Sequence, residues 1–220
     1  MGRRAASGRK EKRMKQQERQ KNSKEKILQA SIEEFSQFGY EKVTMDSICA
    51  KHKISKGMMY QYYSGKDDLF LLCVQEMYTM MQAYIEERIS ELKKKEALEA
   101  LKGFWTLRES FFEQHPEQKN IFENALLRIP EHLSEKIAEI RRPIESLNRR
   151  FLHETLGKIE LRENLKKENA SIYLEAMESV FWKLVDQYLS KKLVSDVHSM
   201  METAGELWDM VLLGVVRQTK

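Results

Sequence analysis

The sequence predicts an all-α protein of about nine helices, and three observations support this fold class. Only 9 Gly and 3 Pro occur in 220 residues, too few turn formers for an all-β or low-complexity chain. After Gly65, four glycines are spread over 155 residues, a spacing that suits long helices. Apolar residues make up 41% of the chain and charged residues 33%, the mixture that amphipathic helices need to bury one face and hydrate the other.

Positive charge is concentrated at the N-terminus. Residues 1–24 contain ten Lys or Arg and two Glu, a net charge of +8, whereas the rest of the chain has 28 basic and 32 acidic residues, a net charge of −4. In residues 1–22, here called the basic arm, Met14 is the one large apolar residue after Met1, so we expect a disordered segment. A solubilising tail is one interpretation; an electrostatic contact with nucleic acid or an acidic membrane is the other.

Several classes of protein are disfavoured by what the sequence lacks. No apolar run approaches the roughly 18 residues of a membrane span, and no apolar stretch follows the basic N-terminus as in a signal peptide. Cys49 and Cys73 fall in apolar helical patterns and predict reduced thiols in a cytoplasmic protein. The five histidines have no metal-ligand spacing, and phosphate-binding glycine loops and nucleophile elbows are absent. We therefore expect no metal, no cofactor and no enzyme activity.

Residues 23–66 predict three short helices in a helix-turn-helix layout. The first helix begins near Ser23 and ends at Gly39 in the left-handed conformation. Thr44 is the predicted N-cap of the second helix, and Ser55 that of the third. In such a unit the last helix enters the DNA major groove with its N-terminal side chains toward the base edges.

The residue types of the third helix suit contact with DNA. Gly57 has no side chain, so the helix can approach the duplex closely. Gln61 can form hydrogen bonds with a base, adenine best. Ser55 and Lys56 make a cationic helix start suited to phosphate. The alternative interpretation is that the tyrosines of this helix are core residues of a small helical domain.

The stretch from Ile27 to Phe70, ILQASIEEFSQFGYEKVTMDSICAKHKISKGMMYQYYSGKDDLF, resembles the DNA-binding domain of the TetR/AcrR family of one-component transcriptional regulators. The following residues match the family pattern in register and without a gap: Glu34-Phe35, Gly39-Tyr40, Val43-Thr44-Met45, Ile48, Lys56-Gly57, Tyr60, Tyr62-Tyr63, Lys66-Asp67 and Leu69-Phe70. The departures are mild: Cys49 stands where Ala is usual, Met59 where a branched aliphatic is common, and Gly65 where Ser or Asn is common.

This resemblance implies nine DNA-contacting residues. Those that would face the bases are Lys56, Gly57, Met58 and Gln61. Those that would bind backbone phosphates are Thr44, Ser55, Tyr60, Tyr62 and Lys66. The core residues that it implies are Ile27, Phe35, Ile48, Met59 and Tyr63. Met58 has no hydrogen bond to offer, so it could contact only a thymine methyl group.

Residues 67–220 are expected to form a helical ligand-binding and dimerisation domain. Predicted helices span about 67–92, 96–114, 117–128, 131–158 (with Pro143 inside), 165–191 and 195–216. In the family that the sequence resembles, such a domain holds an internal ligand pocket, and its last two helices form a four-helix bundle with a second copy. The alternative for these two helices is that they fill a monomeric core.

The candidate pocket residues share apolar helix faces, although such stripes are more often simply core. They are Met77, Met81, Tyr84, Phe104, Trp105, Arg108, Phe111, Phe122, Leu126, Phe181 and Trp182. Arg108 could pair with an anionic ligand or extend to solvent. The candidate dimer-interface residues are Met177, Phe181, Leu184, Tyr188, Ala204, Leu207, Trp208, Val211 and Val215.

The sequence therefore predicts a DNA-binding transcriptional regulator. The favoured hypothesis is a repressor that binds a palindromic operator in double-stranded DNA as a homodimer and is released by a small, largely apolar effector. A second hypothesis is an architectural or nonspecific DNA-binding protein that uses the basic arm. A third, an all-helical enzyme or lipid carrier, finds no support in the residues.

Overall fold

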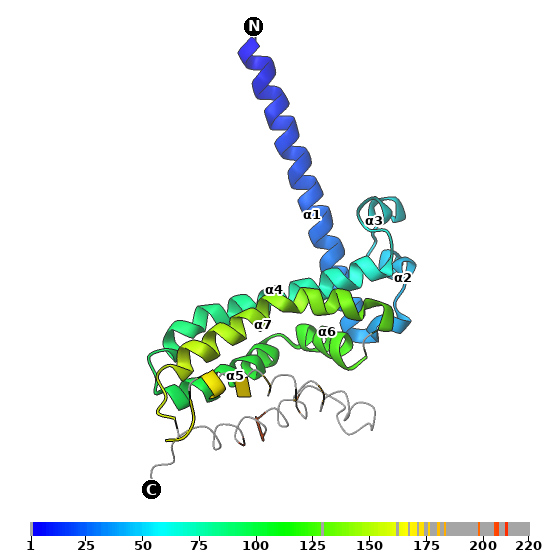
Figure 1. The fold of residues 1–220 in the computed structure, drawn as a ribbon. Coiled ribbons are helices and arrows are strands. Elements are labelled where there is room, and N and C mark those ends of the chain that lie inside the picture. Colours follow the sequence, from blue (N-terminus) through cyan, green and yellow to red (C-terminus); the bar gives the residue numbers. More distant parts are fainter. Residues whose placement is uncertain are drawn as a thin grey trace.

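The computed structural model describes residues 2–128, 130–161 and 163–166, followed by isolated positions between 168 and 210. Its regular elements over this part of the chain are seven α-helices and one 3₁₀ helix (Figure 1). The predicted all-α fold is confirmed. The last two predicted helices lie almost wholly outside the described residues.

Three helices build the N-terminal unit: α1 (Gly2–Lys42), α2 (Met45–Lys51) and α3 (Lys56–Tyr62). Helix α1 continues without interruption through the basic arm, so the predicted helix start near Ser23 is wrong, and the arm is helical rather than disordered. In Figure 1 the N-terminal half of α1 projects away from the rest of the molecule, and α3 lies beside its base.

Helix propagation explains the extension of α1 into the basic arm. A lack of apolar residues shows that a segment has little to bury, but it does not prevent the segment from extending a helix. Once the buried half of α1 supplies a formed helix, added residues need no new nucleus. The arm is rich in Lys, Arg, Glu and Gln, which are all good helix formers, and it contains no proline.

Gly39 interrupts the helical geometry of α1, as the sequence predicts. Its φ of 75° is positive, but its ψ of 169° places it outside the left-handed helical region, in a conformation that only glycine adopts readily. A Cβ atom at this position would also lie 2.9 Å from Oδ1 of Asn124 in α6. Gly39 thus turns the chain and lets α6 approach α1 closely.

The C-terminal unit consists of α4 (Lys66–Leu92), α5 (Ala97–Gln114), α6 (Pro116–Leu127), η1 (Glu131–Leu133) and α7 (Ser134–Leu156). Helix α4 leaves the N-terminal unit and packs along α7 and α5 (Figure 1). Helix α6 packs on both α1 and α4, so it contacts both units. One continuous hydrophobic core runs from Ile27 in α1 to Leu156 in α7. Within the described residues, no helix is both long and apolar enough to cross a bilayer.

The segment Ser64-Gly65-Lys66-Asp67 has the residue spacing of a capping box with Ser64 as the cap, but the structure begins α4 differently. Gly65 is the N-cap residue and offers no side chain, and Ser64 instead donates to Oδ2 of Asp68 from its backbone nitrogen at 2.9 Å and from its hydroxyl at 2.5 Å. The Asp67 carboxylate is therefore available to contact Tyr40 in α1 and His132 in η1.

Candidate nucleic-acid interface

Side-chain caps fix the two short helices of the helix-turn-helix. Thr44 Oγ1 accepts from the backbone nitrogen of Ser47, and the Ser47 hydroxyl oxygen accepts from the nitrogen of Thr44, both at 3.0 Å. Ser55 Oγ accepts from the backbone nitrogen of Met58 at 3.2 Å. Both predicted N-caps are confirmed. Each cap satisfies a backbone donor that a seven-residue helix otherwise leaves free, and so stabilises it.

Helix α3 buries one face and exposes another. Met59 is fully buried, and Ile27, Phe35 and Ile48 lie with it in the core as predicted. Gly57 and Gln61 are exposed, and Tyr60 keeps 52% of its surface. No atom would lie within 4 Å of a Cβ at Gly57. This helix therefore presents a small, polar outer surface that a DNA groove can accommodate.

Met58, Tyr62 and Tyr63 are half-buried and pack against the core. Thus the core interpretation of the tyrosines holds in part for Tyr62 and Tyr63, whereas Tyr60 faces solvent. The ammonium of Lys24 in α1 lies 5.6 Å from the centre of the Tyr62 ring, a contact that joins α1 to α3 just after the basic arm.

Two predicted DNA-contacting lysines already have partners. Lys56 Nζ lies 2.7 Å from Oδ2 of Asp46, an exposed ion pair that joins the first turns of α2 and α3. Lys66 Nζ donates to the carbonyl oxygen of Tyr40 at 3.1 Å and lies 4.0 Å from the centre of that residue's ring. An ammonium group has three donors, so each lysine retains donors that a phosphate could accept.

A polar cluster that the sequence did not predict joins the two units. The Tyr40 hydroxyl at the end of α1 donates to Oδ1 of Asp67 in α4. Nε2 of His132 in η1 lies 3.0 Å from Oδ2 of the same carboxylate. The Tyr40 hydrogen bond, together with His132 and the positive charge of Lys66, holds the pKa of Asp67 below its usual value. No local pattern signals this cluster, because its members are far apart in the sequence.

A second cluster fastens α2 to α1. Glu34 is almost completely buried, and its Oε1 lies 2.6 Å from Lys51 Nζ and 3.1 Å from His52 Nε2. Burial by itself raises the pKa of Glu34, but the hydrogen bonds and charges of Lys51 and His52 outweigh it and lower the pKa. Glu33 completes a group of three metal-ligand types with Glu34 and His52. The Lys51 ammonium already supplies the counter-charge there, so the geometry is that of an ion-pair cluster.

The described candidates for the effector pocket gather in one region of α4, α5 and α6. Those buried are Met77, Met81, Phe104, Phe111 and Phe122; those half-buried are Tyr84, Trp105 and Leu126. Their rings contact neighbouring rings, for example Tyr84 with Phe111 at 5.6 Å between centres. Phe181, Trp182 and every predicted dimer-interface residue lie outside the described residues.

Arg108 is buried in this region, so the alternative that it extends to solvent is wrong. Its guanidinium donates to the carbonyl oxygen of Phe104 at 3.0 Å and to Oδ1 of Asn148 in α7 at 2.6 Å. It also lies 4.6 Å from the centre of the Trp105 ring. The sequence did not predict Asn148 as its partner, because nothing in the sequence indicates which turn of α7 faces α5.

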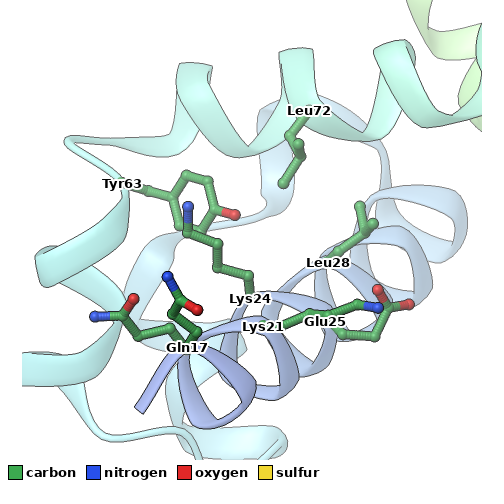
Figure 2. Close-up of a pocket in the computed structure, with 8 residues that line it drawn as sticks. Gln17, Lys21, Lys24, Glu25, Leu28, Tyr63 and Leu72 are labelled. Carbon is green, nitrogen blue, oxygen red and sulfur yellow. The ribbon is translucent and has the colours of Figure 1, made fainter. Parts of the chain in front are cut away.

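A cleft of about 560 Å³ lies between α1, the end of α3 and α4 (Figure 2). Its lining residues, which define the arm cleft, are Gln17, Gln20, Lys21, Lys24, Glu25, Leu28, Tyr63 and Leu72. The cleft is formed by the unexpected helical arm, so no sequence pattern pointed to it. It is separate from the predicted pocket residues.

Comparison with known proteins identifies the N-terminal unit. The model of the family described as "Bacterial regulatory proteins, tetR family" matches residues 27–73. YhgD of Bacillus subtilis, described as an uncharacterized HTH-type transcriptional regulator, is 31% identical over 68 residues, which are 31% of this chain and 34% of YhgD. Residues 27–73 thus form a DNA-binding domain of the TetR family.

Solved structures of TetR-like architecture extend the likeness over most of the chain. NalD of Pseudomonas aeruginosa, described as a secondary repressor of a multidrug efflux pump, has a TM-score of 0.59 at 18% identity, covering 92% of this chain and all of NalD. FadR of Bacillus subtilis, solved in complex with stearoyl-CoA, has a TM-score of 0.53 at 19% identity, covering 84% of this chain and 96% of FadR. At these identities the likeness establishes the fold alone.

The TetR match coincides with the part of the chain that the caps and clusters above fix in place. It begins at Ile27, the first buried residue of α1, and ends at Cys73 in the buried part of α4. The basic arm precedes the matched residues, so its helix lies outside the family match. The arm cleft joins residues of this N-terminal part of α1 to Leu28, Tyr63 and Leu72, which lie inside the match.

Proposed function

We propose that this chain is a cytoplasmic transcriptional repressor that binds a palindromic DNA operator as a homodimer and is released by a small, largely apolar effector. The observation that supports DNA binding most strongly is the exposed face of α3. It is capped, anchored through Met59, and presents Gly57, Tyr60 and Gln61 outward. This is the geometry of a helix that enters a major groove.

Repression and effector release are supported by the architecture. Helix α6 contacts α1, and α4 runs from the helix-turn-helix into the core of the C-terminal unit. An effector that binds better to one arrangement of α4 and α6 shifts the spacing of two recognition helices away from the roughly 34–36 Å that successive major grooves require. Stearoyl-CoA, with which FadR was solved, has a long apolar chain, and such a chain suits the apolar candidates around Arg108.

The role of α3 is tested with Gln61→Ala and Tyr60→Phe on a duplex selected by the wild-type protein from a random pool. Loss of the Gln61 amide should relax discrimination at one base pair by about 1–3 kcal/mol. Loss of the Tyr60 hydroxyl should weaken binding to all sequences to a similar extent, because a phosphate contact has no sequence information. Competition titrations with single-base variants measure both effects. A uniform loss for Gln61→Ala would contradict the assignment to a base.

The second candidate function, an architectural DNA-binding protein, is supported by the basic arm. Removal of residues 2–22 separates the two, since the buried part of α1 begins only at Ile27. A repressor keeps its preference for the selected duplex over a scrambled one after this truncation. An arm-driven binder loses most of its affinity for both duplexes.

A further inference from the structure

The arm cleft combines an apolar floor with a polar and positively charged rim. Leu28, Tyr63 and Leu72 contribute the apolar surface, and Lys21 and Lys24 contribute ammonium groups. Figure 2 shows the Lys24 side chain extending from α1 toward Tyr63. In the described part of the chain, neither lysine forms an ion pair with a carboxylate, although Glu25 also borders the cleft. The rim is therefore suited to an anion.

The helical period places the polar rim along one side of α1. Gln17, Lys21 and Lys24 are separated by four and three residues, so they follow one another on the same face. Gln20 lies beside this row. Amide and ammonium donors thus repeat along the axis of the helix, an arrangement that suits a ligand with regularly spaced acceptors more than one with a single anionic group.

The position of the cleft relates it to the recognition helix. Lys24 also lies over the Tyr62 ring at the end of α3, so the rim of the cleft and the exposed face of α3 are close neighbours. The residues from 2 to 23 span roughly 30 Å at 1.5 Å per residue. A major groove is about 12 Å wide and a minor groove about 6 Å. With α3 in a major groove, the arm is long enough to pass the strand that borders this groove.

We propose that the arm cleft and the helical arm bind the sugar-phosphate backbone of DNA immediately outside the half-site that α3 reads. This rests on the proposed DNA-binding function of α3. Phosphates contact the ammonium and amide groups of the rim, and a deoxyribose packs on Leu28, Tyr63 and Leu72. Each protomer then contacts one strand from two sides. The arm lengthens the operator footprint and adds affinity without adding base specificity.

The test compares Lys21→Gln/Lys24→Gln with the charge-matched control Lys94→Gln/Lys95→Gln. The control lysines lie beyond the far end of α4 and pair with Glu91 and Glu99. The probe is the duplex selected by the wild-type protein, titrated at several salt concentrations. Each lost phosphate contact should reduce the magnitude of the slope of log K against log salt by about 0.9. The cleft variant loses two lysines in each protomer, so a bound dimer loses four contacts and its slope should fall by about 3.6. We expect this reduction, and affinity weaker by about two to three orders of magnitude at physiological salt, for the cleft variant alone.

Neutral methylphosphonates at the flanking phosphates provide the matching change on the DNA. They should weaken binding of the wild-type protein and leave the cleft variant unaffected, because the same contact is removed from either side. Equal salt slopes for the two lysine variants would overturn the proposal. So would loss of binding to phosphatidylserine vesicles in the cleft variant with an unchanged DNA slope, which would assign the cleft to a membrane surface. A failure of the proposed DNA-binding function can be told apart from a failure of the cleft proposal. In the first case the wild-type protein would not prefer its selected duplex over a scrambled one.

Discussion

At the residue scale, two glycines of the N-terminal unit have opposite structural roles. Gly39 has a φ of 75° and lies against Asn124, whereas a Cβ at Gly57 would meet open space. The first is required by the fold, and the second is exposed on the surface assigned to DNA. Substitution of each by alanine therefore separates stability from binding.

We expect Gly39→Ala to lower the free energy of unfolding by about 1–3 kcal/mol, because alanine is strained at this backbone conformation and its methyl group is too close to Asn124. Gly57→Ala should leave stability unchanged or raise it by up to about 1 kcal/mol, because alanine favours helix, and should weaken DNA binding by keeping α3 away from the groove. Urea denaturation and DNA titration measure the two effects. Loss of stability in Gly57→Ala would contradict the open space at this position. Normal DNA binding by the same variant would contradict the assignment of Gly57 to the DNA-facing surface.

The lowered pKa of Asp67 links stability to acid pH. Its carboxylate has a folded-state pKa below the unfolded value of about 4, so its contribution to stability is present above that value and is lost as the pH falls through the folded pKa. We expect Asp67→Asn to unfold less steeply with acid than the wild-type protein. Tyr40→Phe should raise the pKa of Asp67 toward its usual value, as followed by NMR titration of the carboxyl carbon. An unchanged titration would show that the Tyr40 hydroxyl has no part in the shift.

At the element scale, the sequence predicted those features of the helix-turn-helix that local chemistry determines. The caps at Thr44 and Ser55 depend on side chains three residues from their partners, whereas the burial of Met59 was implied by the family resemblance. The extension of α1 through the basic arm was not predicted, because a helix can propagate into residues that bury no apolar surface. The contacts of Arg108 with Asn148 and of Asp67 with His132 join helices distant in the chain, so they required the packing of α5 and α4 on α7 and η1.

The ion pair of Asp46 with Lys56 provides a prediction about α2 and α3. Lys56 has to leave Asp46, or share it, to reach DNA, and the Asp46 carboxylate repels phosphate. We expect Asp46→Asn to tighten DNA binding about two- to fivefold, while stability changes little because solvent screens this exposed ion pair. The gain should disappear in a Lys56→Gln background. Weaker binding by Asp46→Asn alone would instead show that Asp46 holds Lys56 in its binding position.

At the scale of the whole molecule, the charge asymmetry of the sequence gains a structural meaning. The +8 segment forms most of the projecting part of α1 beside α3, and the −4 remainder includes the core of α4 to α7. Specific reading of DNA is assigned to a small exposed face with few charges, while the arm supplies phosphate contacts at its flank. Helix α6 and the Tyr40–Asp67–His132 cluster connect this surface to the domain proposed to sense the effector.

We propose that a dimer of this chain reads DNA through α3. The most direct test is to select bound duplexes from a random pool with the full-length protein. We expect the selected sequences to be palindromic, with half-site centres about 10–10.5 base pairs or a multiple of this apart, because a two-fold protein places two recognition helices on one side of the duplex. Recovery of sequences without a shared motif, or with a single unpaired half-site, would contradict the proposed mode of binding.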